Sequence, residues 1–143
     1  MTQMYDITIT SASDKIAKGI LSPSSLAESL IQRIEELEPS LKAWVTIDKP
    51  AVLKAAEALD LELKGKGPRS PLHGIPVGIK DIYYTAGMKT TACSKVYADF
   101  VPTYDATAVT RLKEAGAIVL GKTVTTEFAA GDPPPTINPW NPA

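Results

Sequence analysis

The amino-acid sequence predicts an α/β fold, in which an N-terminal helical layer is followed by the start of a mixed or parallel sheet. Apolar residues recur at helical spacing through residues 1–65. Residues 66–143 instead contain an alternating strand pattern, a helical pattern and a short apolar run, in that order. A strand, a helix and a second strand in succession are typical of an α/β unit with parallel strands. We expect a single domain over residues 1–143 that is divided in this way.

Three helices are expected in the first part of the chain. The longest covers about residues 23–38, because Ser22 is a good N-cap and Pro39 is expected to end the helix. A shorter helix is expected at about residues 13–18, and Pro50 is suited to open a third. The apolar positions at helical spacing in the longest helix, which predict its buried stripe, are Leu26, Leu30, Ile34 and Leu37.

Three short strands are expected. Residues 43–47 are strand-like, and apolar residues alternate with other residues through 74–80. Residues 117–121, "AIVLG", follow a helical pattern and have the composition of a fully buried strand. Three strands without a closing helix are few for an open α/β sheet. The sequence therefore predicts an incomplete domain.

Composition and charge exclude several classes of protein. The chain is 44% hydrophobic and 22% charged, as in a folded soluble protein. Its net charge of -1 gives no electrostatic reason to expect a nucleic acid or an anionic membrane as a partner. The sequence lacks both an apolar run of the roughly 20 residues that cross a bilayer and the pattern of a signal peptide. A single cysteine forms no internal disulfide, so we expect a cytoplasmic protein.

Lys80 is the strongest candidate for a catalytic side chain. It ends the run "GIPVGIK", in which a charged side chain is costly because its neighbours are apolar. If this run is extended, two glycines share one face with the lysine and leave it bare, so that a substrate or another backbone segment can approach. A partly desolvated lysine at this place could act as a base. The alternative is a lysine at the sheet edge whose amino group extends into solvent.

Two other patterns give weaker hypotheses. Residues 116–123, "GAIVLGKT", match the letters of a phosphate-binding loop, but the middle residues have the composition of a strand and the helix precedes them. Cys93 and His73 could form a nucleophile–base pair only if they meet in space, and single residues of these types are more often incidental. Clustered cysteine and histidine ligands are absent from the sequence, so no metal site is predicted.

Three sequence blocks, read in order, resemble the N-terminal part of the amidase signature family. They are "LHGIPVGIKDIYYTAGMKTTACSK", "DATAVTRLKEAGAIVLGKTVTTEFA" and "NPWNPA". The opening helices, with "ELEPSLKAWVTI", are also similar to the usual start of that family. Because "GIPVGIKD" matches the family's lysine motif, the resemblance implies that Lys80 is the catalytic lysine.

The resemblance also implies a reaction, the cleavage of carboxamide C–N bonds by a Ser–cis-Ser–Lys triad. In the family, a neutral lysine takes a proton from a bridging serine, which in turn activates a nucleophilic serine for attack on the amide carbonyl. Backbone N–H groups stabilise the oxyanion, and neither a metal nor an organic cofactor is needed. The expected partner is a small carboxamide substrate, without direct contact to nucleic acid or membrane.

The sequence departs from the family pattern at one decisive point. Both serines of the triad belong to a Gly/Ser-rich stretch just after the segment that resembles "NPWNPA", and this sequence stops at Ala143. Lys80 is then the one triad member present, since Ser94 belongs to a different block. We expect the chain alone to be an inactive fragment that self-associates through exposed apolar surface. Three alternatives stay open: a non-catalytic interaction or assembly module, a subunit fragment of a glutaminyl-tRNA-type amidotransferase, and a Schiff-base role for Lys80.

Overall fold

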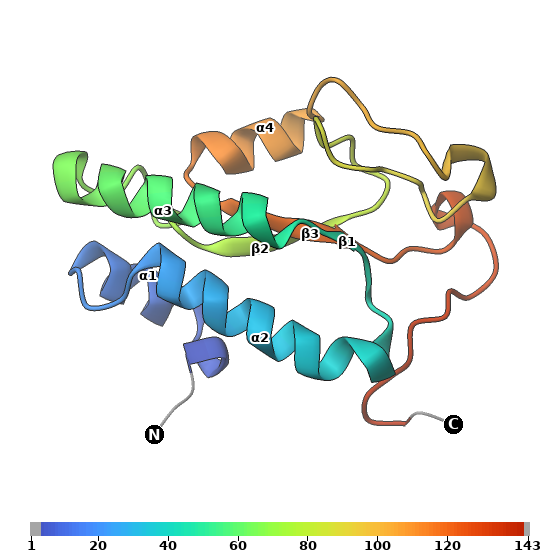
Figure 1. The fold of residues 1–143 in the computed structure, drawn as a ribbon, viewed down its shortest axis with the longest axis horizontal. Coiled ribbons are helices and arrows are strands. Elements are labelled where there is room, and N and C mark those ends of the chain that lie inside the picture. The colour runs from blue at the N-terminus through green and yellow to red at the C-terminus, as the bar shows by residue number, and fades with distance from the viewer. Residues whose placement is uncertain (1–3, 142–143) are drawn as a thin grey trace. The chain divides into compact units, whose positions relative to one another are not determined.

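The computed structural model describes residues 4–141 of the chain (Figure 1). Its helices are α1 (Ile9–Ala17), α2 (Pro23–Leu41), α3 (Lys49–Lys66) and α4 (Thr107–Glu114). Its strands are β1 (Trp44–Ile47), β2 (Pro76–Lys80) and β3 (Ile118–Thr123). The last two positions of the "NPWNPA" block, 142 and 143, lie outside the described residues. The predicted α/β class is confirmed.

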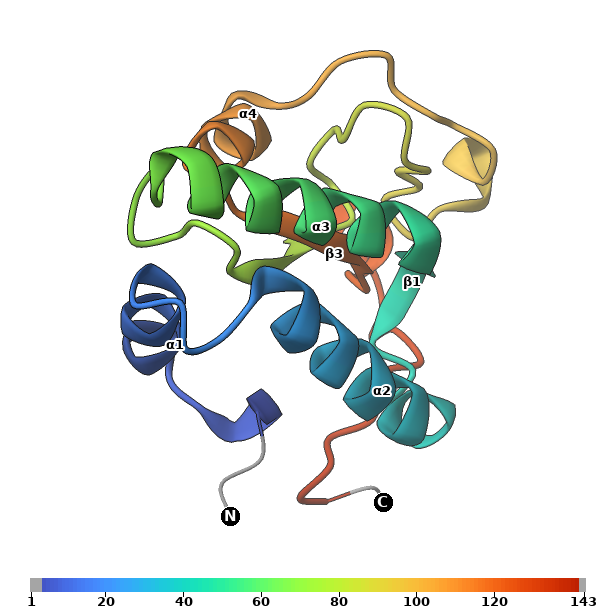
Figure 2. The same ribbon diagram turned by 60° about the vertical axis from the view of Figure 1, so that its left-hand side comes forward.

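The three strands form one sheet in the order β1-β3-β2, with β3 in the centre. Strands β1 and β3 are antiparallel, with Trp44 opposite Thr123 and Thr46 opposite Lys122. The register is irregular between Trp44 and Thr46, where β1 contains an extra residue. Figure 2 shows β1 beside β3.

The pair β2 and β3 is parallel. The amide of Ile118 donates to the carbonyl of Ile75 at 2.9 Å, and further along, the amide of Asp81 donates to the carbonyl of Thr123 at 3.0 Å. Because the partners advance in the same direction along both strands, the strands run the same way. Helix α4 connects them, so the predicted strand–helix–strand unit is confirmed.

The chain forms two compact units, and each contains several separate stretches of sequence. The first unit contains the residues up to Ile34, Asp48–Val77 and Arg111–Leu120. The second contains Glu35–Ile47, Gly78–Thr110 and the residues from Gly121 onward. A division near residue 65 stays a prediction.

The first unit has a small apolar core between helices and the start of β2. Ile16 of α1 and Leu26 of α2 are buried against Ile75, which directly precedes β2. Leu30 and Leu63 pack at its edge. Ile16 is only 1% exposed, so this cluster excludes water from the last turn of α1 and the first turn of α2.

The N-termini of the helices follow the capping rules. The amide of Ser25 donates to the hydroxyl of Ser22 at 3.0 Å, which confirms Ser22 as the N-cap of α2. Helix α3 begins in the same manner, because the amide of Ala51 donates to the carboxylate of Asp48. Helix α1 is longer than predicted and begins at Ile9, where the hydroxyl of Thr8 accepts from the amide of Ser11.

The prediction that Pro39 ends α2 is wrong, since the helix continues to Leu41. A proline inside a helix removes its own N–H donor and crowds the carbonyl four residues before it, but it leaves the N–H groups of the residues after it free to continue the last turn. The next turn is still closed, because the amide of Lys42 donates to the carbonyl of Glu38 at 2.9 Å. The carboxylate of Glu38 then accepts from the amides of Ala43 and Trp44, which leads the chain into β1.

The second unit contains a long irregular segment between β2 and α4, coloured yellow in Figure 1. Within it, the described regular element is a short 3-10 helix, Lys95–Tyr97. Buried threonines at positions 85, 90 and 91 replace the apolar side chains of an ordinary core. Backbone polar groups outside regular elements need other partners, and hydroxyl groups can supply them.

Candidate functional site

Lys80 is the last residue of β2, and its side chain is exposed. The strand ends there because the amide of Tyr83 turns back to donate to the carbonyl of Lys80 at 3.0 Å. Of the two interpretations of this lysine drawn from the sequence, its exposure agrees with an amino group that extends into solvent. In these 143 residues Lys80 is therefore accessible to a reacting partner rather than desolvated.

The face of β2 that contains Lys80 is not left bare by its glycines. A methyl group added at Gly78 would lie 2.9 Å from Cγ2 of Thr123 and 3.0 Å from Cη2 of Trp44. The indole ring of Trp44 therefore occupies the space beside Gly78 that we had expected to be open to a substrate or another backbone segment. Gly78 is needed for the close approach of β1 and β3 side chains.

The residue after Lys80 is the centre of a buried polar network. Asp81 is 0% exposed, and one oxygen of its carboxylate accepts from both the amide (3.0 Å) and the hydroxyl (2.6 Å) of Thr91. Its other oxygen faces Nζ of Lys122 at 3.4 Å, an ion pair without a short hydrogen bond. Its carbonyl accepts from the amide of Ala92 at 2.9 Å. Within the described residues, the oxygen that faces Lys122 has this ion pair as its polar contact and accepts no hydrogen bond.

Lys122 of β3 is the largest side chain in the described residues that is fully buried. Its amino group donates to the carbonyl of Tyr83 at 2.6 Å and to the hydroxyl of Thr90 at 2.7 Å. Burial lowers the pKa of Lys122 from its ordinary value, and the nearby Asp81 carboxylate opposes part of that decrease. The sequence interpretation missed this pair. A usable signal was present, because Lys122 directly follows the run 117–121 that was predicted to be a fully buried strand, and a charge at such a place needs a partner.

Two segments with unusual backbone conformation meet beside this network. Ala92, Cys93 and Phe128 each have a φ of 50°, and Ala129 has a φ of 60°. The amide of Phe128 donates to the carbonyl of Ala92 at 3.0 Å, so the strained residues lie against each other. Left-handed conformations of residues other than glycine persist only where the surroundings impose them, and they concentrate at functional sites.

Side chains hold the same two segments together. The buried hydroxyl of Ser94 donates to the carboxylate of Glu127 at 2.6 Å and accepts from the amide of Val96. The thiol sulfur of Cys93 accepts from the amide of Thr125 at 3.3 Å. Ser94 and Cys93 thus have structural partners within the second unit, and the exclusion of Ser94 as the nucleophile stays a prediction.

His73 has structural partners of its own. It is buried, with Nδ1 accepting from the amide of Arg69 at 3.3 Å and Nε2 lying 3.1 Å from the carbonyl of Leu59. Both ring nitrogens are therefore used inside the first unit, whereas Cys93 belongs to the second. The letters "GAIVLGKT" form the turn after α4 and strand β3, and not a phosphate-binding loop. No group of three potential metal-ligating side chains occurs in residues 4–141.

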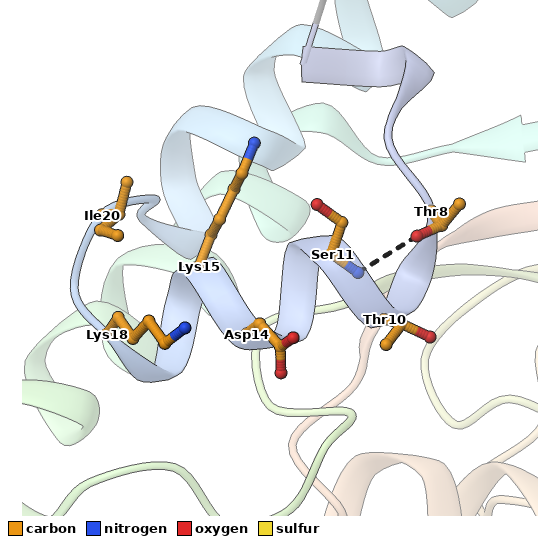
Figure 3. Close-up of a pocket in the computed structure, with 7 residues that line it drawn as sticks. All are labelled: Thr8, Thr10, Ser11, Asp14, Lys15, Lys18 and Ile20. Carbon is orange, nitrogen blue, oxygen red and sulfur yellow. Dashed lines mark hydrogen bonds between the residues drawn. The ribbon is translucent and has the colours of Figure 1, made fainter.

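A hollow of about 480 Å³ lies beside α1 in the first unit (Figure 3). Most of the residues that line it are of polar or charged types, and they include Asp14, Lys15 and Lys18. The hydroxyl of Thr8, which the figure shows at the start of the helix, is already used as the N-cap acceptor for Ser11. The hollow contains none of the candidate catalytic residues.

A smaller hollow of about 270 Å³ lies in the second unit and is lined by aromatic side chains. Tyr84 and Phe100 pack with ring centroids 5.2 Å apart, and Tyr97 meets Phe128 edge-on at 5.8 Å. Thr90, which accepts from Lys122, also lines this hollow. The polar network therefore forms part of one wall.

Residues 25–143 match the Amidase family. The chain belongs to the amidase family. No helix within residues 4–141 is long and apolar enough to span a membrane.

Several relatives in the amidase family are similar to nearly all of this chain. The glutamyl-tRNA(Gln) amidotransferase A subunit from Roseiflexus castenholzii is 42% identical over 99% of the chain, and that from Geobacter metallireducens is 41% identical over 97%. The chain spans about 30% of the length of each of these two relatives.

Solved amidase structures have the same fold over this region. The native peptide amidase from Stenotrophomonas maltophilia has a TM-score of 0.84 at 35% identity, and the match covers 91% of this chain and 27% of that one. An amidase family protein from Bacillus anthracis str. Ames has a TM-score of 0.86 at 31% identity, over 97% of this chain and 30% of that one.

Proposed function

We propose that this chain provides the lysine-bearing part of an amidase that cleaves carboxamide C–N bonds, with Lys80 as the general base. Two findings together support the proposal. The chain belongs to the amidase family, and Lys80 of the "GIPVGIKD" block lies accessible at the end of β2. An accessible amine at a fixed strand end can receive a proton from a serine supplied by further polypeptide of the family.

The proposed chemistry begins with proton transfer to Nζ of Lys80. A bridging serine gives its proton to the amine and takes the proton of a second serine, whose Oγ attacks the amide carbonyl. The tetrahedral intermediate collapses to an acyl ester as the C–N bond breaks, and the proton held by Lys80 returns through the bridging serine to the leaving ammonia or amine. Water then cleaves the ester by the same route in reverse.

The 143-residue chain by itself is proposed to be inactive, because a base without its nucleophile loses nearly all of the chemical acceleration. Its exposed apolar side chains favour self-association. Those that lie in the second unit are Ile82, Tyr83, Val96, Tyr97, Val101, Tyr104, Phe128 and Trp140. Amide hydrolysis measured beside light scattering tests both statements, and turnover by the purified chain contradicts the first.

A second candidate is a subunit of an amidotransferase that moves ammonia within a larger complex in the cytoplasm. The identity of 41–42% to the A subunits of two glutamyl-tRNA(Gln) amidotransferases favours this candidate over a free-standing hydrolase. Both candidates use the same first half-reaction, so the role of Lys80 is common to them.

A chimera tests this role directly. Residues 1–143 replace the matching part of the Stenotrophomonas peptide amidase, and ammonia release from a peptide amide is measured. Lys80→Met is expected to lower kcat by about 10²-fold to 10⁴-fold, the range typical of a lost acid–base group. Lys54→Met, which removes an exposed lysine from α3, is the charge-matched control and should retain activity.

Either of two outcomes overturns the proposal. One is a Lys80→Met chimera that is as active as its parent. The other is a parent chimera that unfolds cooperatively, as a folded protein does, and yet lacks activity, because residues 1–143 then fail to supply the catalytic lysine.

A further inference from the structure

We propose that the buried pair of Lys122 and Asp81 is a positioning device that fixes the backbone from which Lys80 presents its amine. This inference rests on the proposed function for its catalytic meaning, but its physical content concerns the turn at residues 80–83. Lys122 itself touches no reacting atom.

The alternation of strand side chains shows why the pair cannot act directly. The Cβ position of Gly78 faces the methyl group of Thr123, so Gly78, Thr123 and, by the two-residue period, Lys80 share one side of the sheet. Lys122 precedes Thr123 and therefore points to the opposite side. Its amino group is 0% exposed and cannot meet a substrate there.

The contacts of the pair fix the turn after Lys80 at successive points. The turn closes through the amide of Tyr83 to the carbonyl of Lys80, and the carbonyl of the same Tyr83 accepts from Lys122 at 2.6 Å. Between these residues, the amide of Asp81 donates to the carbonyl of Thr123, and its carboxylate faces Lys122 at 3.4 Å. One charged side chain thus holds two of the three residues that follow Lys80.

The pair of Lys122 and Asp81 also binds the segment at residues 90–91. Asp81 binds the amide and hydroxyl of Thr91, and Lys122 binds the hydroxyl of Thr90. The turn and the segment at 90–91 are therefore cross-linked through two neighbouring charges. A general base must lie within hydrogen-bond reach of its serine, and a shift of about 1 Å in such a group can cost on the order of 100-fold in rate.

Within residues 4–141, Lys80 is exposed, so the support that these residues give its side chain comes through the backbone. A buried lysine has its position imposed by neighbouring side chains, whereas an exposed lysine depends on its backbone for orientation. The contacts of Lys122 and Asp81 hold the backbone of the turn at residues 80–83, from which the little-packed side chain of Lys80 extends.

The test measures backbone order at Ile82 and Tyr83 by 15N relaxation of the 143-residue chain. In the parent protein, order parameters near 0.85 are expected, as for rigid backbone. Lys122→Met should lower them to below about 0.6, the range of flexible segments. Thr90→Val removes one acceptor of Lys122 with little change of shape, so it keeps the test valid if Lys122→Met unfolds.

Two controls separate positioning from general destabilisation. Thr90→Ser retains the hydroxyl and should retain the order of the turn. Ile16→Ala opens a cavity in the core of the first unit and lowers the unfolding midpoint, but it should leave order at residues 82 and 83 unchanged. The proposal is overturned if Thr90→Val leaves the turn as rigid as in the parent, or if Ile16→Ala loosens it equally.

The catalytic consequence is measured separately in the chimera described above. Thr90→Val should lower kcat on the order of 10-fold with little change in KM, because the base is displaced while substrate binding is retained. If Lys80→Met proves harmless in that chimera, the proposed function fails, whereas the relaxation result still decides whether the pair fixes the turn.

Discussion

Replacing Lys122 by methionine is the sharpest test of the buried network. The substitution keeps a side chain of similar length but removes the amino group, which donates to Tyr83 and Thr90. The carboxylate of Asp81 then stays 0% exposed, with Thr91 as its remaining side-chain partner. Removing one partner of a buried ion pair typically costs about 3–5 kcal/mol, because the other charge is left uncompensated. We expect a loss of about 3–5 kcal/mol in the free energy of unfolding.

This loss is a large share of the roughly 5–15 kcal/mol that stabilises an ordinary domain. Urea unfolding followed by circular dichroism measures it, provided that the slope against urea is unchanged. Asp81→Asn combined with Lys122→Met removes both charges and should recover part of the stability. A loss below about 1 kcal/mol in the single variant would refute the reasoning, because that is the range of an exposed ion pair.

The same pair predicts how stability changes with pH. Burial lowers the pKa of Lys122 in the folded chain below the ordinary value of 10.5, so the unfolded chain binds more protons in the alkaline range. The contribution of Lys122 to stability is therefore smallest below its folded pKa and increases as the pH rises toward 10.5. The stability difference between the parent and Lys122→Met should widen over that interval, and a difference that narrows would contradict the assigned shift.

Three further predictions concern stability and use the same unfolding measurement. Gly121→Ala would drive a methyl group into the carbonyl oxygen of Thr46, so we expect a loss of several kcal/mol, as for strain at a closely packed site; a stable variant would show that β1 is free to move away. Ser22→Ala removes the N-cap of α2 and should cost about 1 kcal/mol, while Ser22→Gly should cost only a few tenths. The pKa of Glu62 is lowered mainly by its hydrogen bond from Arg69, so Glu62→Gln should reduce stability slightly at pH 7. The stability difference between the parent and Glu62→Gln should disappear as the pH falls through the folded pKa of Glu62, below 4.5, and a difference that grows in acid would contradict the assigned shift.

Local patterns predicted the regular elements well where the physical cause is local. Ser22 begins α2 because a hydroxyl at this position satisfies an amide of the first turn, whatever the rest of the chain does. The apolar run at 117–121 became the central strand β3, since a run of this kind must be covered on both faces. Pro39 shows the limit of such rules, because its effect depends on how many helical bonds remain after it.

The sequence by itself determined the α/β class, the parallel strand–helix–strand unit, the family and the choice of Lys80 as the candidate base, because these follow from spacing and from matched blocks. Only the tertiary structure decided which lysine is buried. Lys80 and Lys122 both end or interrupt apolar strands, yet one is exposed and the other is 0% exposed. The difference arises because residues distant in the sequence, Asp81, Tyr83 and Thr90, meet over one face of β3 and supply the partners that a buried ammonium requires.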